Sequence, residues 1–319
     1  MLHLRLPRWN EKMMLSVTQL APVWVVEKAS GRDPGPAYVL ASRLGCLFRR
    51  VSMDDLILDS HLEGRRAPGL ILTSGVRGGY AALRAGRRAQ CPVVWCVKGE
   101  TRSAPMLRSL PFDLVVASSS AAVAPKFCPT LGPLTAVSPH VLAHAGRAWQ
   151  ERLEHLPHPR IAVNLGDGAF RTPEEALLLG KKLALMVNRY GGSVLLSVRE
   201  DTHPELTDAF IVGLSASFIL VWRTGEPDED PTLGFMACAD TVVVLGGNAV
   251  ALVEACAVDV PVFLMEREQD LRGARGRLVR RLIEDHHLRL LEDDFVAWPR
   301  PILDEAGRVA DVMKARWAL

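Results

Sequence analysis

The stretch over residues 230–266, DPTLGFMACADTVVVLGGNAVALVEACAVDVPVFLME, carries the pattern that decides the fold. Its apolar runs predict a short helix over 233–239, a buried strand over 241–245, a second helix over 249–258 and a second buried strand over 261–265. Two buried strands joined through one helix form a βαβ unit, which is the building block of parallel sheets in α/β proteins.

The turn Gly246-Gly247-Asn248, between the first strand and the second helix, has the composition of an anion-binding turn. Glycines let a ligand approach the backbone, and Asn248 stands at the N-cap of a helix whose first N–H groups lack intrahelical partners. Glu254 is the only charged residue of that helix, and a buried carboxylate requires a partner or a ligand. Two interpretations are open: a phosphate at the turn with a sugar hydroxyl at Glu254, or packing glycines with a salt-bridged glutamate.

Length and composition limit the fold and the partners. The 319 residues suffice for two domains of roughly 150 residues each. A net charge of +2 and an aromatic content of 6% argue against a nucleic-acid partner, which needs a basic surface or a stacking platform.

The cysteines and histidines form no pattern typical of a metal site. None of the six cysteines belongs to a CxxC pair, and most lie in apolar runs, so we expect reduced thiols in a cytoplasmic chain. His140 and His144 are one helical turn apart, but no third ligand is evident, and we expect no metal there.

No apolar segment reaches the length of a membrane-spanning helix, since the longest, residues 209–222, is short and interrupted by glycine and serine. Residues 1–14 lack the apolar region of a signal peptide. The arginine-rich run 272–289 is typical of a solvated helix face, with contact to anionic lipid as the alternative. We therefore expect a cytoplasmic protein, with a weak peripheral contact at the inner membrane left open.

In the first half of the chain, strands expected at 23–26, 46–51, 70–73, 93–97 and 114–117 alternate with helices. This alternation predicts a doubly wound parallel sheet whose ligand crevice lies at the carboxyl ends of the strands. Four residues near those ends are candidates for binding an acceptor or a phosphate: Gly31, Gly35, Ser74 and Lys98. Asp33 is the candidate catalytic base there, although a loop aspartate that bonds its own backbone is the simpler interpretation.

The second half begins after EHLPHPR, residues 154–160, which we interpret as the interdomain linker. Strands are expected at 161–165, 193–197 and 218–222, in addition to the two of the opening stretch. Gly166 and Gly168 follow the first of these strands, and they either admit a phosphate or make a strand-to-helix turn. Ser197 and Arg199 end the next one, where Arg199 either neutralises a diphosphate or forms a surface salt bridge.

Several segments, in order along the chain, match the pattern of one known family. In the first half these are VWVVEKASGRDPGPAYVLASRLG (23–45), PFDLVVAS (111–118) and PTLGPLTAVSP (129–139). In the second half, SVRE is similar to the start of a Ser-Arg-Arg-Thr-Pro loop, matched at Ser197 and Arg199. Asp230-Pro231-Thr232 stands for Asn-Pro-Tyr, and Glu254-Ala255 for the end of Ser-Glu-Ala. Together these segments resemble the ELM1 family, which comprises plant mitochondrial-fission proteins and bacterial relatives regarded as GT-B-like glycosyltransferases.

The resemblance implies a GT-B-like fold of two doubly wound, Rossmann-like domains facing a cleft. We expect an acceptor-side domain over 15–155, a nucleotide-sugar-side domain over 156–303, and a C-terminal helix over 304–319 that returns to the first domain. The implied activity is transfer of a sugar from a nucleotide-diphosphate sugar to an unidentified acceptor, with an envelope glycan or a lipid as candidates. The expected nucleotide-sugar site consists of Gly166, Gly168, Ser197, Arg199, Gly246, Gly247, Asn248 and Glu254. No cofactor beyond the substrate is implied, and without a DxD pair we expect catalysis independent of metal.

The sequence also departs from the family pattern. Gly247-Asn248 replaces an Asp-Ser pair, Val250-Ala251 replaces Ser-Met, and Pro36-Ala37 stands where a His and a Gln are usual. These losses keep a second hypothesis open, a non-catalytic adaptor that retained the fold, as in organelle fission. A sugar-nucleotide epimerase is a third, less favoured because no pair of acid/base carboxylates is evident. Neither the sugar nor the oligomeric state follows from the sequence.

Overall fold

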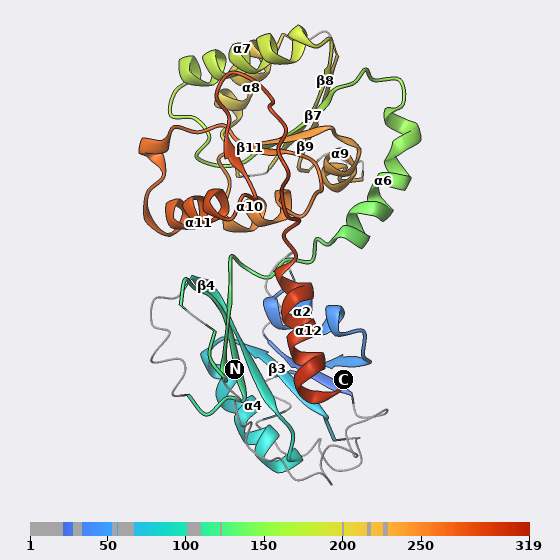
Figure 1. Ribbon diagram of the computed structural model, residues 1–319, viewed down its shortest axis with the longest axis vertical. Coiled ribbons are helices and arrows are strands. Elements are labelled where there is room, and N and C mark those ends of the chain that lie inside the picture. Colours follow the sequence, from blue (N-terminus) through green and yellow to red (C-terminus); the bar gives the residue numbers. More distant parts are fainter. Residues whose placement is uncertain are drawn as a thin grey trace. The chain divides into compact units, whose positions relative to one another are not determined.

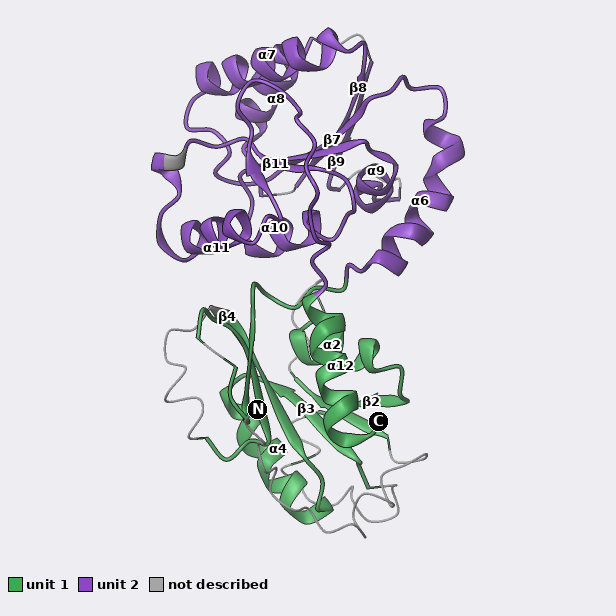
Figure 2. Ribbon diagram, viewed as in Figure 1, with its two compact units in different colours: residues 1–136, 305–319 green, residues 137–304 purple. Residues whose placement is uncertain are grey.

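The computed structural model describes residues 22–27, 34–52, 56, 67–100, 110–121, 123–199, 201–215, 218–225 and 229–319. Two compact units divide the chain: Met1–Ala136 together with Glu305–Leu319, and Val137–Asp304 (Figure 2). Each unit contains one six-stranded sheet in which every named strand pair is parallel, so the predicted α/β class is confirmed.

The sheet of the first unit has the strand order β2-β1-β3-β4-β5-β6. Its strands are β1 (Val23–Val26), β2 (Phe48–Arg50), β3 (Leu70–Ser74), β4 (Val93–Glu100), β5 (Leu114–Ser118) and β6 (Phe127–Thr130). The sequence pattern predicted the first five but not β6, an edge strand of four residues that contains Pro129. Proline cannot donate to a sheet, and edge strands are where it is tolerated.

Helices α2 (Pro36–Leu44) and α12 (Glu305–Trp317) pack against each other and cover one face of this sheet (Figure 1). Helix α4 (Val76–Ala89) covers the other face. Gly45 ends α2 in the left-handed conformation, as expected for a glycine at that position. The C-terminal helix therefore belongs to the core of the first unit, where Val309, Ala310 and Met313 are buried.

The sheet of the second unit has the strand order β12-β11-β10-β7-β8-β9. Its strands are β7 (Arg160–Leu165), β8 (Ser193–Val198), β9 (Ile219–Arg223), β10 (Thr241–Leu245), β11 (Val262–Leu264) and β12 (Arg289–Leu290). The opening stretch forms α9 (Thr232–Cys238), β10, α10 (Ala249–Ala255) and β11, which confirms the expected βαβ unit. Helix α10 ends three residues earlier than the pattern predicted, and its C-cap is Cys256.

Helices α7 (Pro173–Arg189) and α8 (Pro204–Gly213) lie on one face of this sheet (Figure 1). On the other face lie α9, α10 and α11 (Gly273–Glu284), with a short 3-10 helix at Glu268–Asp270. The apolar core between β7, β8 and α7 includes Ile161, Val163 and Val194. Successive strand residues alternate between the faces, so Asn164 and Ser197 face the α9 side.

Helix α6 (Pro139–Leu153) belongs to the second unit, which corrects the boundary expected at residues 155 and 156. It packs on α9, where the ring of Trp149 lies 5.6 Å from that of Phe235 in an edge-on arrangement. Gly234 makes this packing possible, because a Cβ there would lie 2.3 Å from Trp149. The stretch EHLPHPR therefore joins two elements of one unit and is no interdomain linker.

Candidate functional site

At the carboxyl edge of the second sheet, the loop after β7 and the turn after β10 pack closely together. The Gly247 N–H donates to the Asp167 carbonyl at 2.8 Å. A Cβ on Gly166 would lie 2.6 Å from the Gly247 Cα, and one on Gly246 would lie 2.5 Å from the Asp167 carbonyl oxygen. The sequence-predicted glycines Gly166, Gly246 and Gly247 are therefore brought together, and backbone packing leaves no room for a side chain on Gly166 or Gly246.

A buried ion pair that the sequence analysis missed holds this turn in place. Arg275 on α11 donates to the carbonyls of Gly246 and Gly247 at 2.9 and 2.8 Å, and to the Glu266 carboxylate. Glu266 in turn accepts the Gly246 N–H at 3.0 Å. Only 27% of the Arg275 side chain and 10% of the Glu266 side chain are exposed. An internal carboxylate thus occupies the donor that a phosphate would use.

Asn248 caps α10, as expected, and its side chain uses the helix donors. Its Oδ1 accepts the N–H groups of Val250 and Ala251 at 2.9 and 3.1 Å. Glu254 lies half-buried on the same helix, between the buried residues Val253 and Ala255. With the N–H groups of Gly246 and Gly247 also bonded, most donors of the expected anion site are already satisfied within the chain.

A row of polar side chains crosses the α9 face of the sheet next to the same edge. Asn164, Ser197 and Trp222 are the next-to-last residues of β7, β8 and β9, and they are in register with one another. Asn164 donates to the sulfur of Met236 at 3.1 Å. Its Oδ1, the Ser197 hydroxyl and the Trp222 indole N–H are buried without a hydrogen-bond partner among the described residues.

Arg199 lies immediately beyond this row. Its Nε is also buried without a hydrogen bond in the described part of the chain, and Asp201 is 4.0 Å away. Its Cδ lies 3.6 Å from the point that a Cβ on Gly166 would occupy. We call Asn164, Ser197, Trp222 and Arg199 the polar strip. Buried polar atoms are nearly always bonded in native proteins, so the polar strip has the character of a site for a polar ligand.

In the first unit, two of the candidate residues, Gly35 and Ser74, contact a carboxylate that the sequence analysis did not single out. Glu27 follows β1 and accepts the Ser74 hydroxyl at 3.0 Å and the Tyr38 N–H of α2 at 3.2 Å. A Cβ on Gly35 would lie 2.2 Å from Glu27 Oε2, so this glycine makes room for the carboxylate. Lys98 is exposed on β4.

The other two first-unit candidates, Gly31 and Asp33, lie outside the described residues. Glu27 is an acidic group that the structure places at the carboxyl edge of the first sheet. Because α2 has no side-chain cap of its own, the Glu27 carboxylate acts as an external cap for its first turn.

Replacing Glu27 by alanine is expected to lower the free energy of unfolding by about 1–2 kcal/mol, because two hydrogen bonds to a carboxylate are lost. Glu27→Gln keeps one acceptor oxygen and should lose less. Urea-induced unfolding of both variants measures the difference. Equal stability of Glu27→Ala and the unmodified chain would show that the carboxylate does not hold α2.

The remaining candidate chemistry concerns metals and thiols. The described residues contain no group of three His, Cys, Asp or Glu side chains arranged to hold a metal ion. All six cysteines are free. Burial raises the pKa of Cys91 and of Cys256 to about 12, so these thiols are protonated and poorly nucleophilic near neutral pH.

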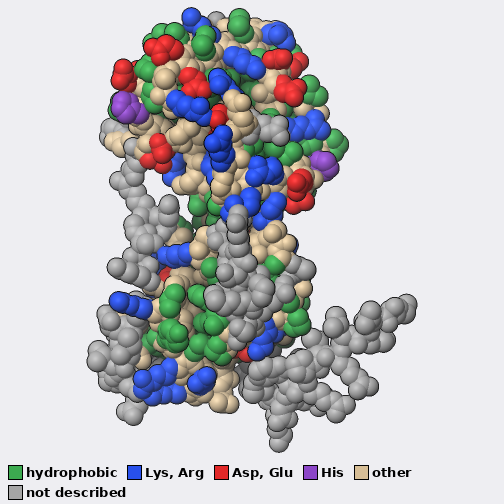
Figure 3. All heavy atoms as spheres, turned by 90° about the vertical axis from the view of Figure 1, so that its left-hand side faces the viewer, with side chains coloured by type: hydrophobic (Ala, Val, Ile, Leu, Met, Phe, Trp, Pro, Cys, Tyr) green, Lys and Arg blue, Asp and Glu red, His purple; other side chains and the backbone are tan. Residues whose placement is uncertain are grey.

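The basic run on α11 and beyond is partly internal. Arg275 faces the Gly246 turn, Arg280 donates to the Leu271 carbonyl at 3.0 Å, and Arg289 lies over the Trp298 ring at 4.4 Å. On the face drawn in Figure 3, basic and acidic side chains are intermixed. No helix in the described ranges combines the length and the apolar character needed to cross a bilayer.

Comparisons with known proteins agree with this architecture. The family model described as Mitochondrial fission ELM1 matches residues 10–317. The mitochondrial fission protein ELM1 of Arabidopsis thaliana is 26% identical over 144 residues, which are 43% of this chain and 32% of that relative. The matched region thus spans about a third of the plant protein.

Two solved structures resemble the whole chain. A Listeria monocytogenes protein described as a "putative UDP-N-acetylglucosamine 2-epimerase" has a TM-score of 0.58 at 12% identity, covering 94% of this chain and 97% of the other. UDP-GlcNAc 2-epimerase from Neisseria meningitidis, solved with UDP-GlcNAc bound, has a TM-score of 0.54 at 11% identity. The match covers 94% of this chain and 99% of the Neisseria chain. At such identities the likeness shows the fold alone, which is the GT-B-like fold expected from the sequence.

Proposed function

Since the chain belongs to the mitochondrial fission ELM1 family, with two GT-B-like units, we propose that it is a glycosyltransferase that binds a nucleotide-diphosphate sugar. The second unit would hold the donor, and the first would hold the acceptor. The observation that carries the proposal is the polar strip, in which Ser197 Oγ and Arg199 Nε are buried without a partner among the described residues. The UDP-GlcNAc bound to the Neisseria protein of similar fold supports this ligand class.

The chemistry of transfer requires stabilisation of the departing diphosphate. The Ser197 hydroxyl and Arg199 Nε are buried, while the Arg199 side chain as a whole is 42% exposed. A guanidinium and a hydroxyl placed in this way can bind phosphate oxygens through charge-assisted hydrogen bonds. The loop after β7 lies beside this guanidinium, since Arg199 Cδ is 3.6 Å from the point that a Cβ on Gly166 would occupy. Arg199 would neutralise charge on the leaving diphosphate while Ser197 orients it, without a metal ion as a required partner.

In this proposal, the turn after β10 has a structural role, and the residues after β7 and β8 bind the ligand. The turn Gly246-Gly247-Asn248 has most of its donors bonded internally, so we expect it to position the loop after β7. The diphosphate is then expected beside Gly166 and Arg199. Glu254 and Gly168 stay predicted contacts of the nucleotide sugar.

A second candidate function is a non-catalytic adaptor that retained the fold. The observation that favours it is the Glu266 carboxylate, which accepts the Gly246 N–H at the place where the phosphate of a nucleotide sugar was expected. The relative from Arabidopsis thaliana is described as a fission protein, which fits an adaptor. If the chain is an adaptor, we expect it to bind a protein partner and to show no turnover of a nucleotide sugar.

A thermal-shift panel of UDP-GlcNAc, UDP-glucose, GDP-mannose and ADP-glucose tests the proposal. A ligand present at 100 times its Kd stabilises the native state by about 2.7 kcal/mol, which raises the Tm by several degrees. Arg199→Ala and Ser197→Ala should each weaken the affinity about tenfold or more. Assay for free nucleotide with candidate acceptors then measures turnover.

The control variant is Lys182→Ala on α7, whose ammonium group pairs with Asp293 at 3.2 Å on the opposite face of the sheet. It should leave any shift unchanged. If no nucleotide sugar raises the Tm, the transferase proposal fails and the adaptor is favoured. A shift that survives Arg199→Ala and Ser197→Ala would place the donor elsewhere.

Location and acceptor belong to the same proposal. We expect a cytoplasmic protein, with peripheral contact at the inner membrane if the acceptor is a lipid. The internal contacts of Arg275 and Arg280 leave less of α11 for such a surface contact than the sequence suggested.

A further inference from the structure

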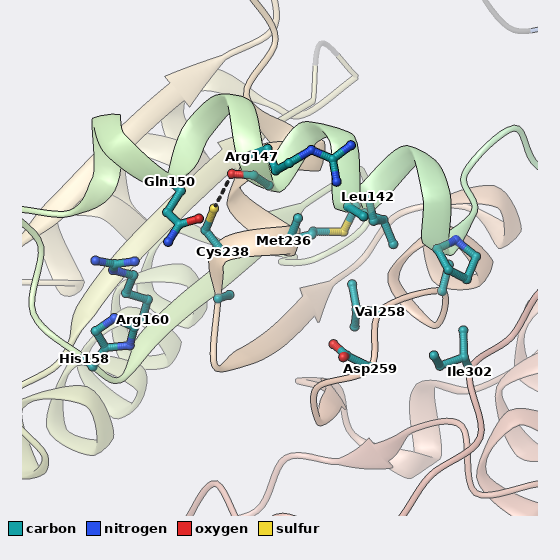
Figure 4. Close-up of a pocket in the computed structure, with 16 residues that line it drawn as sticks. Leu142, Arg147, Gln150, His158, Arg160, Met236, Cys238, Val258, Asp259 and Ile302 are labelled. Carbon is teal, nitrogen blue, oxygen red and sulfur yellow. Dashed lines mark hydrogen bonds between the residues drawn. The ribbon is translucent and has the colours of Figure 1, made fainter.

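A groove of about 530 Å³ lies between α6, α9 and the segment after α10 (Figure 4). All of its lining residues belong to the second unit. Arg160 is the first residue of β7, and Ala239 and Asp259 stand just before β10 and β11. The groove is therefore at the amino ends of the strands, opposite the edge with the polar strip. Its volume falls in the usual range of small-molecule sites.

Arg160 is the anchor of the groove. It is only 7% exposed, and its Nε donates to the Leu156 carbonyl at 3.2 Å. Within the described ranges, its two terminal guanidinium nitrogens have no hydrogen bond, and no carboxylate lies within ion-pair distance of the guanidinium. Removing an unpaired cation from water is costly, so a buried guanidinium that opens into a groove favours an anionic ligand.

The nearby carboxylate of Asp240 is directed to other groups. Its Oδ2 lies 2.6 Å from His158 Nδ1 and accepts the Arg160 backbone N–H at 2.7 Å. The His158 ring and the Gln150 amide lie at the same end of the groove as the Arg160 side chain (Figure 4). Three side chains able to donate hydrogen bonds thus converge on one end.

The rest of the groove is largely apolar, with Arg147 and Asp259 as its charged lining residues. Leu142, Met236 and Val258 are buried side chains that line it, and Ile302 extends it toward the surface. Asp259 lies in this half, away from Arg160 (Figure 4). Its carboxylate disfavours negative charge beside it, and Arg147, the other cation of the lining, is exposed to solvent, so the buried Arg160 is the favoured contact for an anionic group.

We propose that this groove binds an amphipathic organic anion. A carboxylate or phosphate head group contacts Arg160, Gln150 and His158, and a short hydrocarbon chain lies along Leu142 and Met236. The groove is separate from the polar strip, so this proposal does not depend on the glycosyltransferase proposal.

Isothermal titration calorimetry with the full chain tests the site, using octanoate and octyl phosphate below the concentrations at which they form micelles. Inorganic phosphate and octanol supply the head group and the chain separately. We expect at least one amphipathic anion to bind about tenfold or more tightly than either fragment, since both halves contribute. The comparison of octanoate with octyl phosphate shows which head group is preferred.

Two variants and one control locate the binding. Arg160→Gln should weaken binding about tenfold or more by removing the cation. Ala143→Phe, an exposed position on the groove wall, should block the chain while leaving every charge in place. Arg152→Gln is the control, because that arginine is on the same helix but pairs with Glu229 at 3.6 Å.

Absence of heat with both anions would overturn the proposal. Binding that Arg160→Gln and Ala143→Phe both leave unchanged would overturn it as well. If Arg160→Gln fails to fold, Ala143→Phe decides alone: blocked binding supports the groove, and unaltered binding refutes it.

Discussion

Replacement of Glu266 by alanine is expected to lower the free energy of unfolding by about 3–5 kcal/mol, the range for breaking a buried ion pair. The Glu266 carboxylate accepts Arg275 Nη1 at 2.7 Å and the Gly246 N–H at 3.0 Å. Its removal leaves a guanidinium whose side chain is only 27% exposed without a counter-charge. It also leaves a buried backbone donor without its acceptor. Urea-induced unfolding followed by far-UV circular dichroism measures the loss.

Two further variants give that result its meaning. Glu266→Gln keeps the shape and an acceptor for Gly246, and it should cost only about 1–2 kcal/mol. Asp293→Ala removes the exposed pair with Lys182, in which the Asp293 side chain is 93% exposed, and it should cost less than about 0.5 kcal/mol. A loss for Glu266→Ala as small as that for Asp293→Ala would show that the pair does not hold the turn.

The sheets could be predicted because their strands are buried on both faces and appear as short apolar runs. β10 and its parallel partner β7 are examples, and every residue of β10 is buried. β6 was missed because its four residues include a proline. The unit boundary was misplaced because nothing in the sequence of α6 shows that Trp149 packs on Phe235, and proline-rich segments occur within domains as well as between them.

The candidate site was predictable only in part. Glycine turns after buried strands are visible in the sequence, and Gly166, Gly246 and Gly247 do meet at one edge. What the turn does with its donors depends on Glu266 and Arg275, which lie on separate elements and have no distinguishing motif. Glu27 follows a strand like many other polar residues, and only the fold brings Ser74 beside it.

The polar strip had a partial signal in the sequence. Ser197 and Arg199 stood out through the resemblance to a family loop, whereas Asn164 and Trp222 appeared as ordinary strand residues. The alignment of Asn164, Ser197 and Trp222 depends on register, since each of these three is the next-to-last residue of its strand and the three strands are adjacent. Register between strands distant in sequence is set by the whole sheet, which a local pattern does not contain.

Replacement of Gly246 by alanine is expected to lower the free energy of unfolding by about 2–5 kcal/mol, from two separate causes. The residue has a φ of +62°, in the left-handed region that costs other residues about 1–2 kcal/mol. The added Cβ would also lie 2.5 Å from the Asp167 carbonyl oxygen and 2.6 Å from the Ala169 nitrogen. Both are backbone atoms, so relief requires movement of the loop after β7, at a further cost of about 1–3 kcal/mol.

Gly168 in the same loop separates the two causes. Its φ is +73°, but a Cβ there would meet nothing within 4 Å, so Gly168→Ala should lose only the backbone part, about 1–2 kcal/mol. Urea-induced unfolding of the two variants measures the difference. Equal losses would mean that the close packing at Gly246 contributes no stability. A clearly larger loss at Gly246 assigns that glycine to packing and leaves Arg199 and Ser197 as the groups available to a diphosphate.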